Sequence, residues 1–298
     1  MDKKLIKKIN KLKKEKGAII LAHNYQRPEI YEVADFIGDS FELSKKARDA
    51  TEKIIVFCGV KFMAETAKIL SPDKTILLPE ITAGCPMADM IGVEELVNFK
   101  KEHPNAKVVS YVNTNADTKT ETDVCCTSSN AVEIVEGIDA DEILFVPDKN
   151  LGSYVQKKTS KKIISWNGFC VVHERIRKEA ILEMRKKYSE AIIIAHPECR
   201  SEVVDACDYA MSTGGMVKFA RENNGKTIIL ATERDMINRL KRDNPNNKYL
   251  TVGGPCVNMK RTTLNSVLRA LEDEIYEIEL SDDVLTRAKD AIVRMVGG

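Results

Sequence analysis

The chain has 298 residues, of which 43% are hydrophobic and 31% are charged, a composition typical of a folded protein with ordinary cores. Its 46 lysine and arginine residues nearly balance 45 aspartate and glutamate residues, which gives a net charge of +1. Because this balance creates no general attraction toward phosphate backbones or anionic lipids, it argues against nucleic acid and membrane as partners.

The first predicted element is an amphipathic helix within residues 1–16. This segment is rich in lysine and carries Leu5, Ile9 and Leu12 on one helical face. A secretory signal would need a continuous apolar core of about 7–15 residues, and a membrane span needs roughly 20. The sequence has neither pattern, so we expect a cytoplasmic protein.

An apolar, strand-like run that ends in a polar cluster occurs three times along the chain. The same position of the run carries His23, Tyr111 or His196, and these residues are 88 and 85 apart. Three further landmarks repeat with nearly the same spacing: a hydroxyl residue, a residue of a second apolar run, and a cysteine. They are Ser40, Ser128 and Ser212; Phe57, Phe145 and Leu230; and Cys85, Cys170 and Cys256. Four landmarks with one period of about 86 residues predict three copies of one unit.

Each copy is predicted to alternate helices with short strands. A lead helix such as 93–101 or 178–187 precedes the first strand. A polar loop, a helix, the second strand, a helix such as 62–70 and a last strand such as 75–78 follow. This alternation favours parallel sheets with right-handed crossovers, flanked by helices. The sequence therefore predicts an α/β fold of three α/β/α units with short parallel sheets, related by a pseudo-threefold axis.

The expected boundaries follow from the period. The units are 1–86, 87–172 and 173–258, and residues 259–298 form a C-terminal helical extension. Within the extension we expect a helix around 264–271, a short strand at 275–280 and a helix at 283–295. The extension is expected to cover an exposed helix or sheet edge of the first unit.

The ends of the predicted strands are the expected place for a site, because ligands of parallel sheets gather at the carboxyl ends of strands. Three units around one axis would bring these ends together. The residues concerned are His23, Tyr111, His196, Gly59, Pro147 and Thr232.

The three periodic cysteines lie in loops rich in glycine, proline and other small residues. Glycine lets the backbone approach a bulky ligand, and exposed amides can hydrogen-bond to sulfide. Three thiolates from separate loops suit a [4Fe–4S] cluster with one iron free of protein ligands, which could act as a Lewis acid. Zinc and three merely buried cysteines are the alternatives. The other five cysteines have no repeated counterparts and are expected to be small buried side chains; they are Cys58, Cys125, Cys126, Cys199 and Cys207.

Motifs spread over nearly the whole chain resemble those of the quinolinate synthase A family. They are Ala22–Gln26, Ala34–Ser40, Tyr111–Asn113, Thr127–Val132, Pro147–Leu151, His196–Cys199, Ser212–Met216 and Cys256–Lys260. The resemblance implies three α/β/α sandwiches around a central [4Fe–4S] cluster held by Cys85, Cys170 and Cys256. It also implies condensation of iminoaspartate with dihydroxyacetone phosphate to quinolinate, phosphate and two waters, in NAD biosynthesis. An aspartate-oxidising enzyme that supplies iminoaspartate would be a transient partner.

The resemblance also assigns roles to individual residues. Hydroxyls and amides at helix N-termini suit the substrates' two carboxylates and one phosphate, because they bind anions without a buried positive charge. The substrate-binding set implied in this way is His23, Ser40, Tyr111, Asn113, Ser128, His196, Glu198, Ser212 and Thr213. The proton-transfer set is His23, Tyr25, Tyr111, His196 and Glu198.

Some features leave other interpretations open. Phe169 and Asp89 depart from the family pattern beside the second and first cluster cysteines, and His173 is a candidate partner of Cys170. A cluster-dependent dehydratase of small hydroxyacids would share the open iron but would lack the triose phosphate site. A non-catalytic iron–sulfur scaffold or redox sensor would need no array of substrate-binding hydroxyls.

Overall fold

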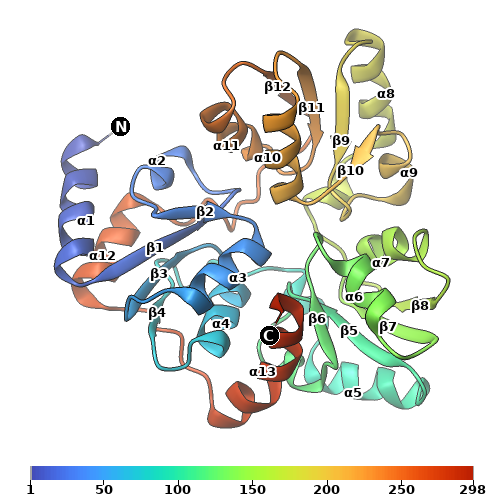
Figure 1. The fold of residues 1–298 in the computed structure, drawn as a ribbon, viewed down its shortest axis with the longest axis horizontal. Coiled ribbons are helices and arrows are strands. Elements are labelled where there is room, and N and C mark those ends of the chain that lie inside the picture. Colours follow the sequence, from blue (N-terminus) through green and yellow to red (C-terminus); the bar gives the residue numbers. More distant parts are fainter. Residues whose placement is uncertain (1, 298) are drawn as a thin grey trace.

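The computed structural model describes residues 2–297, and over this range the chain forms three four-stranded sheets arranged in a triangle (Figure 1). All strand pairs are parallel. The strand orders are β2-β1-β3-β4 in the first sheet, β6-β5-β7-β8 in the second and β10-β9-β11-β12 in the third. The predicted α/β fold with three units is therefore confirmed. The exact division at residues 86, 172 and 258 stays a prediction.

The first sheet and its helices occupy the N-terminal part of the chain. Its strands are β1 (Ala18–His23), β2 (Phe36–Gly38), β3 (Ile54–Cys58) and β4 (Thr75–Leu77). Its helices are α1 (Lys3–Glu15), α2 (Pro28–Tyr31), α3 (Ser40–Asp49) and α4 (Lys61–Leu70). Helix α1 begins where the Asp2 side chain accepts hydrogen bonds from the amides of Lys4 and Leu5, both at 3.1 Å.

The second and third sheets repeat this order. The second has β5 (Lys107–Tyr111), β6 (Val124–Cys126), β7 (Glu142–Val146) and β8 (Lys162–Ser165), with helices α5 (Val93–Glu102), α6 (Ala131–Gly137) and α7 (Lys149–Gln156). The third has β9 (Ile192–Ala195), β10 (Tyr209–Ala210), β11 (Thr227–Ala231) and β12 (Lys248–Thr251), with helices α8 (Lys178–Lys187), α9 (Ser201–Val204), α10 (Thr213–Glu222) and α11 (Met236–Asp243). Short 3-10 turns are η1 (Ala88–Met90), η2 (Thr118–Glu121) and η3 (His173–Arg175).

The central strands are buried on both faces, as expected for parallel sheets. In β1, Ile19 and Leu21 belong to a large core shared by all three sheets, whereas Ile20 belongs to a separate outer core. The second and third sheets follow the same alternation, each with an outer core of its own. The inner faces therefore hold the sheets together around one centre, which places the carboxyl ends of their strands near one another.

A short edge strand precedes the hydroxyl-bearing turn in each sheet, where the sequence predicted only a polar loop. These strands are β2, β6 and β10, and they have only two or three residues, too few for a recognisable hydrophobic period. An aspartate just before each edge strand accepts the amide of a central-strand residue at 2.8 Å. The pairs are Asp35 with Ile20, Asp123 with Val108, and Asp208 with Ile193. This contact repeats at intervals of 88 and 85 residues and sets the start of each edge strand.

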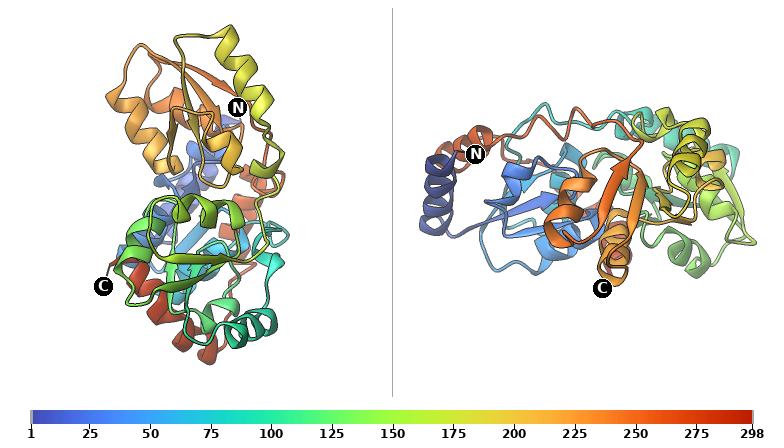
Figure 2. Two further views of the ribbon diagram at one scale, coloured as in Figure 1. Left: turned by 90° about the vertical axis from the view of Figure 1, so that its right-hand side faces the viewer. Right: turned by 90° about the horizontal axis from the view of Figure 1, so that it is seen from above.

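The C-terminal extension contains the two predicted helices but not the predicted strand. Helix α12 (Leu264–Asp273) packs on α1, and α13 (Asp282–Val296) lies between α4 and β6, so it joins the first and second sheets (Figure 2). The segment 275–280 forms only a single antiparallel bridge to β4, between Leu77 and Glu277. The predicted strand is wrong because Glu274 and Tyr276 adopt positive φ angles of 50° and 63°, which interrupt an extended chain.

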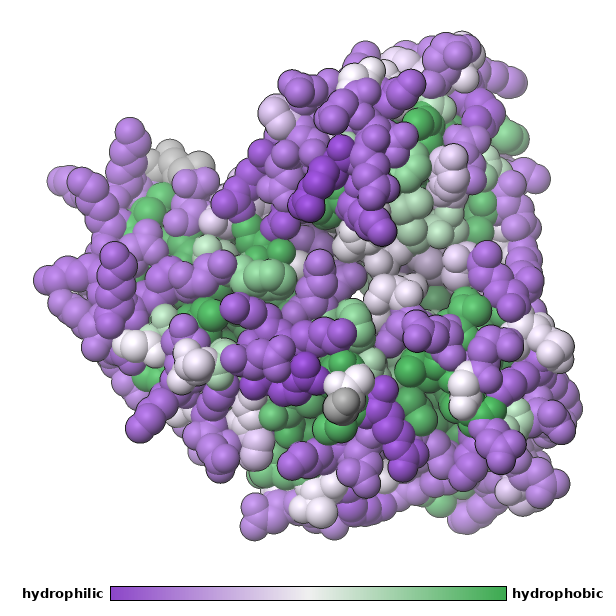
Figure 3. All heavy atoms as spheres, viewed as in Figure 1, coloured by the Kyte–Doolittle hydropathy of each residue, from purple (hydrophilic) through white to green (hydrophobic). Residues whose placement is uncertain are grey.

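Polar and charged side chains cover most of the face drawn in Figure 3, and apolar groups show as patches between them. Of the helices in residues 2–297, none is long and apolar enough to span a bilayer.

Candidate active site

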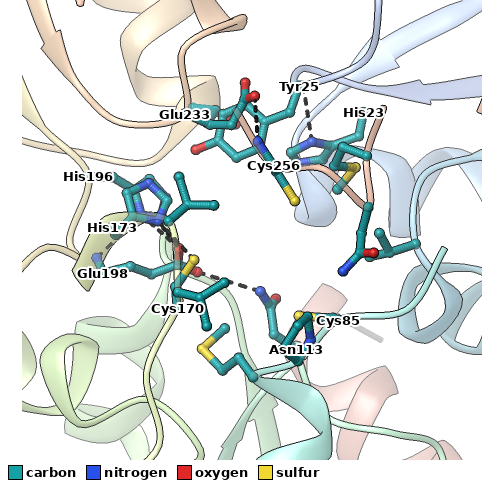
Figure 4. Close-up of a pocket in the computed structure, with 18 of the residues that line it drawn as sticks. His23, Tyr25, Cys85, Asn113, Cys170, His173, His196, Glu198, Glu233 and Cys256 are labelled. Carbon is teal, nitrogen blue, oxygen red and sulfur yellow. Dashed lines mark hydrogen bonds and ion pairs between the residues drawn. The ribbon is translucent and has the colours of Figure 1, made fainter. Parts of the chain in front are cut away.

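A cavity of about 310 Å³ lies where the three sheets meet, and it is lined by residues from all three. This volume is at the small end of the range for small-molecule sites. Almost every predicted site residue lines it (Figure 4). These residues are His23, Tyr25, Ser40, Cys85, Tyr111, Asn113, Ser128, Cys170, His196, Glu198, Thr213 and Cys256. Ser212 is absent from the lining, and so are Gly59, Pro147 and Thr232, which the strand-end rule had selected.

Cys85, Cys170 and Cys256 come from three separate loops, and their sulfur atoms face the same cavity (Figure 4). Each cysteine starts a turn with the same hydrogen bonds. Its carbonyl accepts from the amide four residues on, at 3.3, 2.9 and 3.3 Å respectively. Its sulfur is approached by the amides two and three residues on. Those amides belong to Met87 and Ala88, to Val172 and His173, and to Asn258 and Met259.

These turns fit a metal or iron–sulfur centre. Burial raises the pKa of the Cys85 thiol to about 12, and it also raises the pKa of Cys170 and of Cys256. The three thiols would lose their protons together at neutral pH only with a cation to bind them. Backbone amides aimed at sulfur are the groups that surround such thiolates. Three thiols with six converging amides are therefore suited to hold a cofactor.

His23 and His196 occupy equivalent places at the ends of β1 and β9. The Nδ1 atom of each accepts the amide hydrogen of the residue two positions on, Tyr25 at 3.2 Å and Glu198 at 3.3 Å. Burial is the main cause that lowers the pKa of His23 to about 3 and that of His196 to about 4. Both imidazoles are therefore neutral at pH 7, with the proton on Nε2, where it can be donated to a ligand.

Glu198 is the buried centre of a hydrogen-bonded group. Its Oε1 accepts from the Tyr111 hydroxyl at 2.7 Å, and its Oε2 lies 2.6 Å from His173 Nδ1. The Asn113 amide is at 3.5 Å. Burial opposes ionisation of Glu198, but the imidazoles of His173 and His196 and the Tyr111 hydroxyl outweigh it, so the pKa of this carboxyl is lowered. The charged form of Glu198 is therefore the acceptor at the centre of this group.

The group continues to the opposite side of the cavity. His173 Nε2 lies 2.9 Å from the Thr232 hydroxyl, which lies 2.6 Å from the Tyr25 hydroxyl. Burial raises the pKa of Tyr25 well above its usual value, so Tyr25 retains its proton. A continuous chain of hydrogen bonds thus joins Glu198 to Tyr25 through His173 and Thr232. His173 Nδ1 also lies 3.2 Å from the Cys170 sulfur, which places this histidine beside the cysteine as anticipated.

The predicted hydroxyl residues lie at the N-terminal ends of helices. Ser40 is the first residue of α3, Thr213 the first of α10, and Ser128 lies in the turn before α6. Asn24 donates to the Thr213 hydroxyl at 3.0 Å, so the hydroxyl proton of Thr213 is free to point elsewhere. Ser212 instead accepts the Gly215 amide at 3.2 Å and donates to Asp39 at 3.3 Å, which makes it the cap of α10.

Sequence reasoning missed several lining residues. Asp39, Arg175 and Glu233 border the cavity, and none of them was assigned a role. Glu233 directly follows Thr232, which the strand-end rule did select, so the rule extended by one position would have found it. The group of Cys170, His173 and Glu198 could also hold a metal ion, since one donor atom of each lies within 4.8 Å of the others.

The five remaining cysteines lie outside the cavity lining, and so do Asp89 and Phe169, the two residues that depart from the family pattern. Cys58, Cys125, Cys126 and Cys199 are buried, as predicted, whereas Cys207 is partly exposed, so the prediction is wrong for this cysteine. None of these five cysteines, which all lie within residues 2–297, lines the cavity. Asp89 accepts from the Asn115 side chain at 2.9 Å, and the Phe169 ring lies under the Lys149 ammonium, 4.9 Å from the ring centroid.

Comparisons with known proteins show which family this chain resembles. A family model described as quinolinate synthetase A protein matches residues 7–297. A quinolinate synthase of Thermodesulfovibrio yellowstonii is 49% identical over 299 residues, covering 99% of each chain. Similar enzymes of the same name from Clostridium perfringens and Dehalococcoides mccartyi are each 50% identical over 291 residues. These matches cover 97% of this chain and 97% and 96% of the relatives.

Proposed function

This chain belongs to the quinolinate synthetase A family, and we propose that it acts as a quinolinate synthase of NAD biosynthesis with a [4Fe–4S] cluster. Its substrates would be iminoaspartate and dihydroxyacetone phosphate, and its products quinolinate, phosphate and two waters. All atoms of the two substrates are accounted for in these products. Because the C=N bond of iminoaspartate is open to hydrolysis, a nearby aspartate-oxidising enzyme would be the natural supplier.

The observation that carries the proposal is the meeting of three equivalent cysteine turns with a substrate-sized cavity. Cys85, Cys170 and Cys256 would hold the cluster, and two amides would support each sulfur. When bound, a cluster with only three protein ligands supplies an open iron that polarises substrate oxygens as a Lewis acid. Everything else in the reaction falls to the side chains around it.

The neutral donors suit substrates with three anionic groups. Ser40, Ser128 and Thr213 would bind carboxylate and phosphate oxygens at helix N-termini, where backbone amides and the helix dipole add attraction. Their three positions around one cavity provide a separate place for each anion. Asn113 and the Nε2 protons of His23 and His196 would provide further donors.

The chain of hydrogen bonds between Glu198 and Tyr25 is suited to proton transfer. Forming the imine and removing two waters requires a proton to leave carbon or nitrogen and another to reach a departing oxygen. Glu198, charged and buried, would accept protons on one side of the cavity. Tyr25 would donate on the other side, and Thr232 and His173 would restore its proton from Glu198 without opening the site to water.

The test is product formation by protein purified without oxygen. Iron and sulfide are first measured per chain, and the protein is then mixed with dihydroxyacetone phosphate and iminoaspartate generated from oxaloacetate and ammonium. We expect about four iron and four sulfide per chain, a stoichiometry set by the cluster type, and formation of quinolinate that depends on both substrates. Protein with a full cluster that dehydrates small hydroxyacids but makes no quinolinate would overturn the proposal.

Zinc remains a second candidate because of one observation. The donor atoms of Cys170, His173 and Glu198 lie within 4.8 Å of one another, and cysteine, histidine and carboxylate are all zinc ligands. The same analysis distinguishes the two: zinc without sulfide would support a zinc site, whereas iron with an equal amount of sulfide would exclude it.

A further inference from the structure

Two buried carboxyl groups that were not among the predicted site residues lie just after β7 of the second sheet and β11 of the third. Asp148 follows β7 and Glu233 follows β11, and the two residues are 85 positions apart, which is the spacing of the internal repeat. The side chains of both are fully buried. Each lies against the loop that carries the next periodic cysteine along the chain.

Glu233 holds the Cys256 loop directly. Its Oε1 accepts the amide hydrogen of Cys256 at 2.9 Å, and its Oε2 accepts the amide of Asp235 at 2.8 Å. The Lys260 ammonium lies 3.1 Å from Glu233 and 2.9 Å from Asp235, and it also donates to the Tyr25 carbonyl. The carboxylate is thus satisfied on both oxygens, and it fixes the backbone of the cysteine itself.

Asp148 occupies the matching place beside Cys170. Its Oδ1 accepts the amides of Asn150 at 2.7 Å and Leu151 at 3.0 Å, which begins α7. The Cys170 amide faces the same carboxyl group. Its buried Oδ2 has no hydrogen-bond partner among residues 2–297. The contact to Cys170 is therefore looser than the contact between Glu233 and Cys256.

The two cysteine loops also approach the strand ends in the same way. A Cβ atom on Gly168 would lie 2.4 Å from the Pro147 carbonyl oxygen, and one on Gly253 would lie 1.6 Å from that of Thr232. Backbone hydrogen bonds join Lys149 to Gly168 at 2.9 Å and Arg234 to Gly254 at 3.0 Å. Only glycine allows this approach, so the loops sit directly on the strand ends that carry the acids.

The first sheet provides a natural comparison. Val60 stands 88 positions before Asp148 and has no carboxyl group, although the Lys61 amide still donates to the Ala83 carbonyl at 2.8 Å. The Cys85 loop thus keeps this backbone contact but has no buried acid at the equivalent position, whereas the other two loops have one.

We propose that Glu233 and Asp148 are positioning residues, which hold the backbones of Cys256 and Cys170 so that their sulfurs face a common metal centre. The inference rests on the proposed function, because it requires a centre bound by these cysteines. Glu233 has the larger share, since its Oε1 accepts the Cys256 amide at 2.9 Å, whereas Asp148 Oδ2 has no hydrogen-bond partner among residues 2–297. The acids act through the loops that carry the two cysteines.

The experiment compares iron release from anaerobically loaded proteins on addition of a chelator. Glu233→Ala and Asp148→Ala should release iron roughly 10–100-fold faster than the unaltered protein, the usual effect of removing a group that orients a metal ligand. Glu233→Gln and Asp148→Asn keep an oxygen acceptor and should release iron at rates much closer to the unaltered protein. Of the two alanine variants, Glu233→Ala should have the larger effect.

Two controls separate positioning from a general loss of stability. Asp208→Asn alters an aspartate that accepts the Ile193 amide and does not line the cavity, and Thr263→Ala removes the side-chain cap of α12. Both should release iron at the unaltered rate. Unaltered release in Glu233→Ala and Asp148→Ala, or equally fast release in the two controls, would overturn the inference. Absence of iron and sulfide from the unaltered protein would instead remove the proposed function.

Discussion

The three cysteine turns and the three strand ends line the same cavity, yet they differ in how well they keep the internal symmetry. In the turns, cysteine, carbonyl and two amides are arranged alike in all three copies. At the ends of the first strands the corresponding pairs of residues all differ. They are His23 with Tyr25, Tyr111 with Asn113, and His196 with Glu198.

The difference matches the shapes of the proposed ligands. A cluster offers three equivalent irons to three thiolates, so a symmetric protein can hold it with three copies of one turn. Two different small substrates have no such symmetry, and their binding and proton transfer need a different group at each position. The three units thus share one backbone arrangement, and the different residues at their strand ends give each unit a different chemical role.

The largest effect is expected from breaking one symmetric turn. Replacement of Cys170 by serine should prevent cluster assembly and reduce quinolinate formation to the background rate, because serine is a poor substitute for a soft thiolate. Iron and sulfide content and the visible absorption of the anaerobic protein would measure the loss. We expect Cys85→Ser and Cys256→Ser to behave alike, as equivalent turns should.

The matched control is Cys207→Ser, which changes a partly exposed cysteine outside the cavity lining. It should keep a normal cluster and normal turnover, and so should Cys58→Ser, Cys125→Ser and Cys126→Ser. A full complement of iron and sulfide in Cys170→Ser would contradict the assignment of this cysteine as a ligand.

The next effect tests the asymmetric strand ends. Glu198→Gln and Tyr25→Phe should lower turnover by about 10²–10⁴-fold, the range for loss of a general acid or base, which is roughly 3–5.5 kcal/mol. Both replacements nearly keep the shape of the side chain, so the cluster should remain. Steady-state rates are to be compared with iron content for the same samples.

Two other results would change the roles of these residues. Loss of iron in Glu198→Gln or Tyr25→Phe would mark the residue as structural. Turnover within a few-fold of the unaltered enzyme would remove it from the proton-transfer steps and leave the chain of hydrogen bonds through His173 and Thr232 as scaffold.

A third prediction uses the different pKa values of the residues at the strand ends. His196 has a pKa lowered to about 4, mainly by burial, whereas an unfolded histidine titrates near 6.5. The unfolded chain therefore binds a proton first as pH falls, and stability is lost. Between pH 7.5 and 5 this histidine should cost about 2 kcal/mol of the free energy of unfolding. Tyr111, in the equivalent position, should contribute nothing there, because its pKa is raised.

Urea unfolding of the metal-free protein at pH 7.5 and 5 would measure the effect. The decrease in the free energy of unfolding should be about 2 kcal/mol smaller in His196→Gln than in the unaltered protein. His23, with a pKa of about 3, should behave in the same way. An equal decrease in the unaltered protein and both variants would mean that these imidazoles already titrate normally in the folded state.

Most of the fold could be predicted from the sequence, because the signals of the internal repeat are local and strong. Long apolar runs and a fixed period were sufficient to predict three parallel sheets and to select Cys85, Cys170 and Cys256. The strands of two or three residues were not predicted, because they are determined by hydrogen bonding in register with a neighbouring strand and not by amino-acid composition. The strand expected at 275–280 failed for a related reason, since the backbone at Tyr276 turns to a positive φ in contact with β4.

The contacts between units could not be predicted, because they join residues far apart in sequence. Thr232 meets Tyr25, and Glu198 meets Tyr111, only after sheets of different units have packed together. The period identifies equivalent positions, but it does not tell whether a side chain points into the cavity or away from it. Ser212 illustrates the point, since its spacing matches Ser40 and Ser128 while its hydroxyl faces Asp39.

The smallest predicted effects separate Ser212 from its neighbour Thr213. Ser212 accepts the Gly215 amide and caps α10, so Ser212→Ala should lower the free energy of unfolding by about 1 kcal/mol. Because its side chain is absent from the cavity lining, the KM for dihydroxyacetone phosphate should change little.

Thr213 does line the cavity, and its hydroxyl accepts from Asn24, which leaves the proton available to a substrate oxygen. Thr213→Val keeps the shape and should raise a substrate KM by roughly 10-fold, since a hydrogen bond to a charged group contributes about 1.5–3 kcal/mol. Thermal unfolding and KM measured for both variants would decide the matter. A large KM change in Ser212→Ala with unchanged stability would return Ser212 to the substrate-binding set and would show that the repeat predicts side-chain direction as well as position.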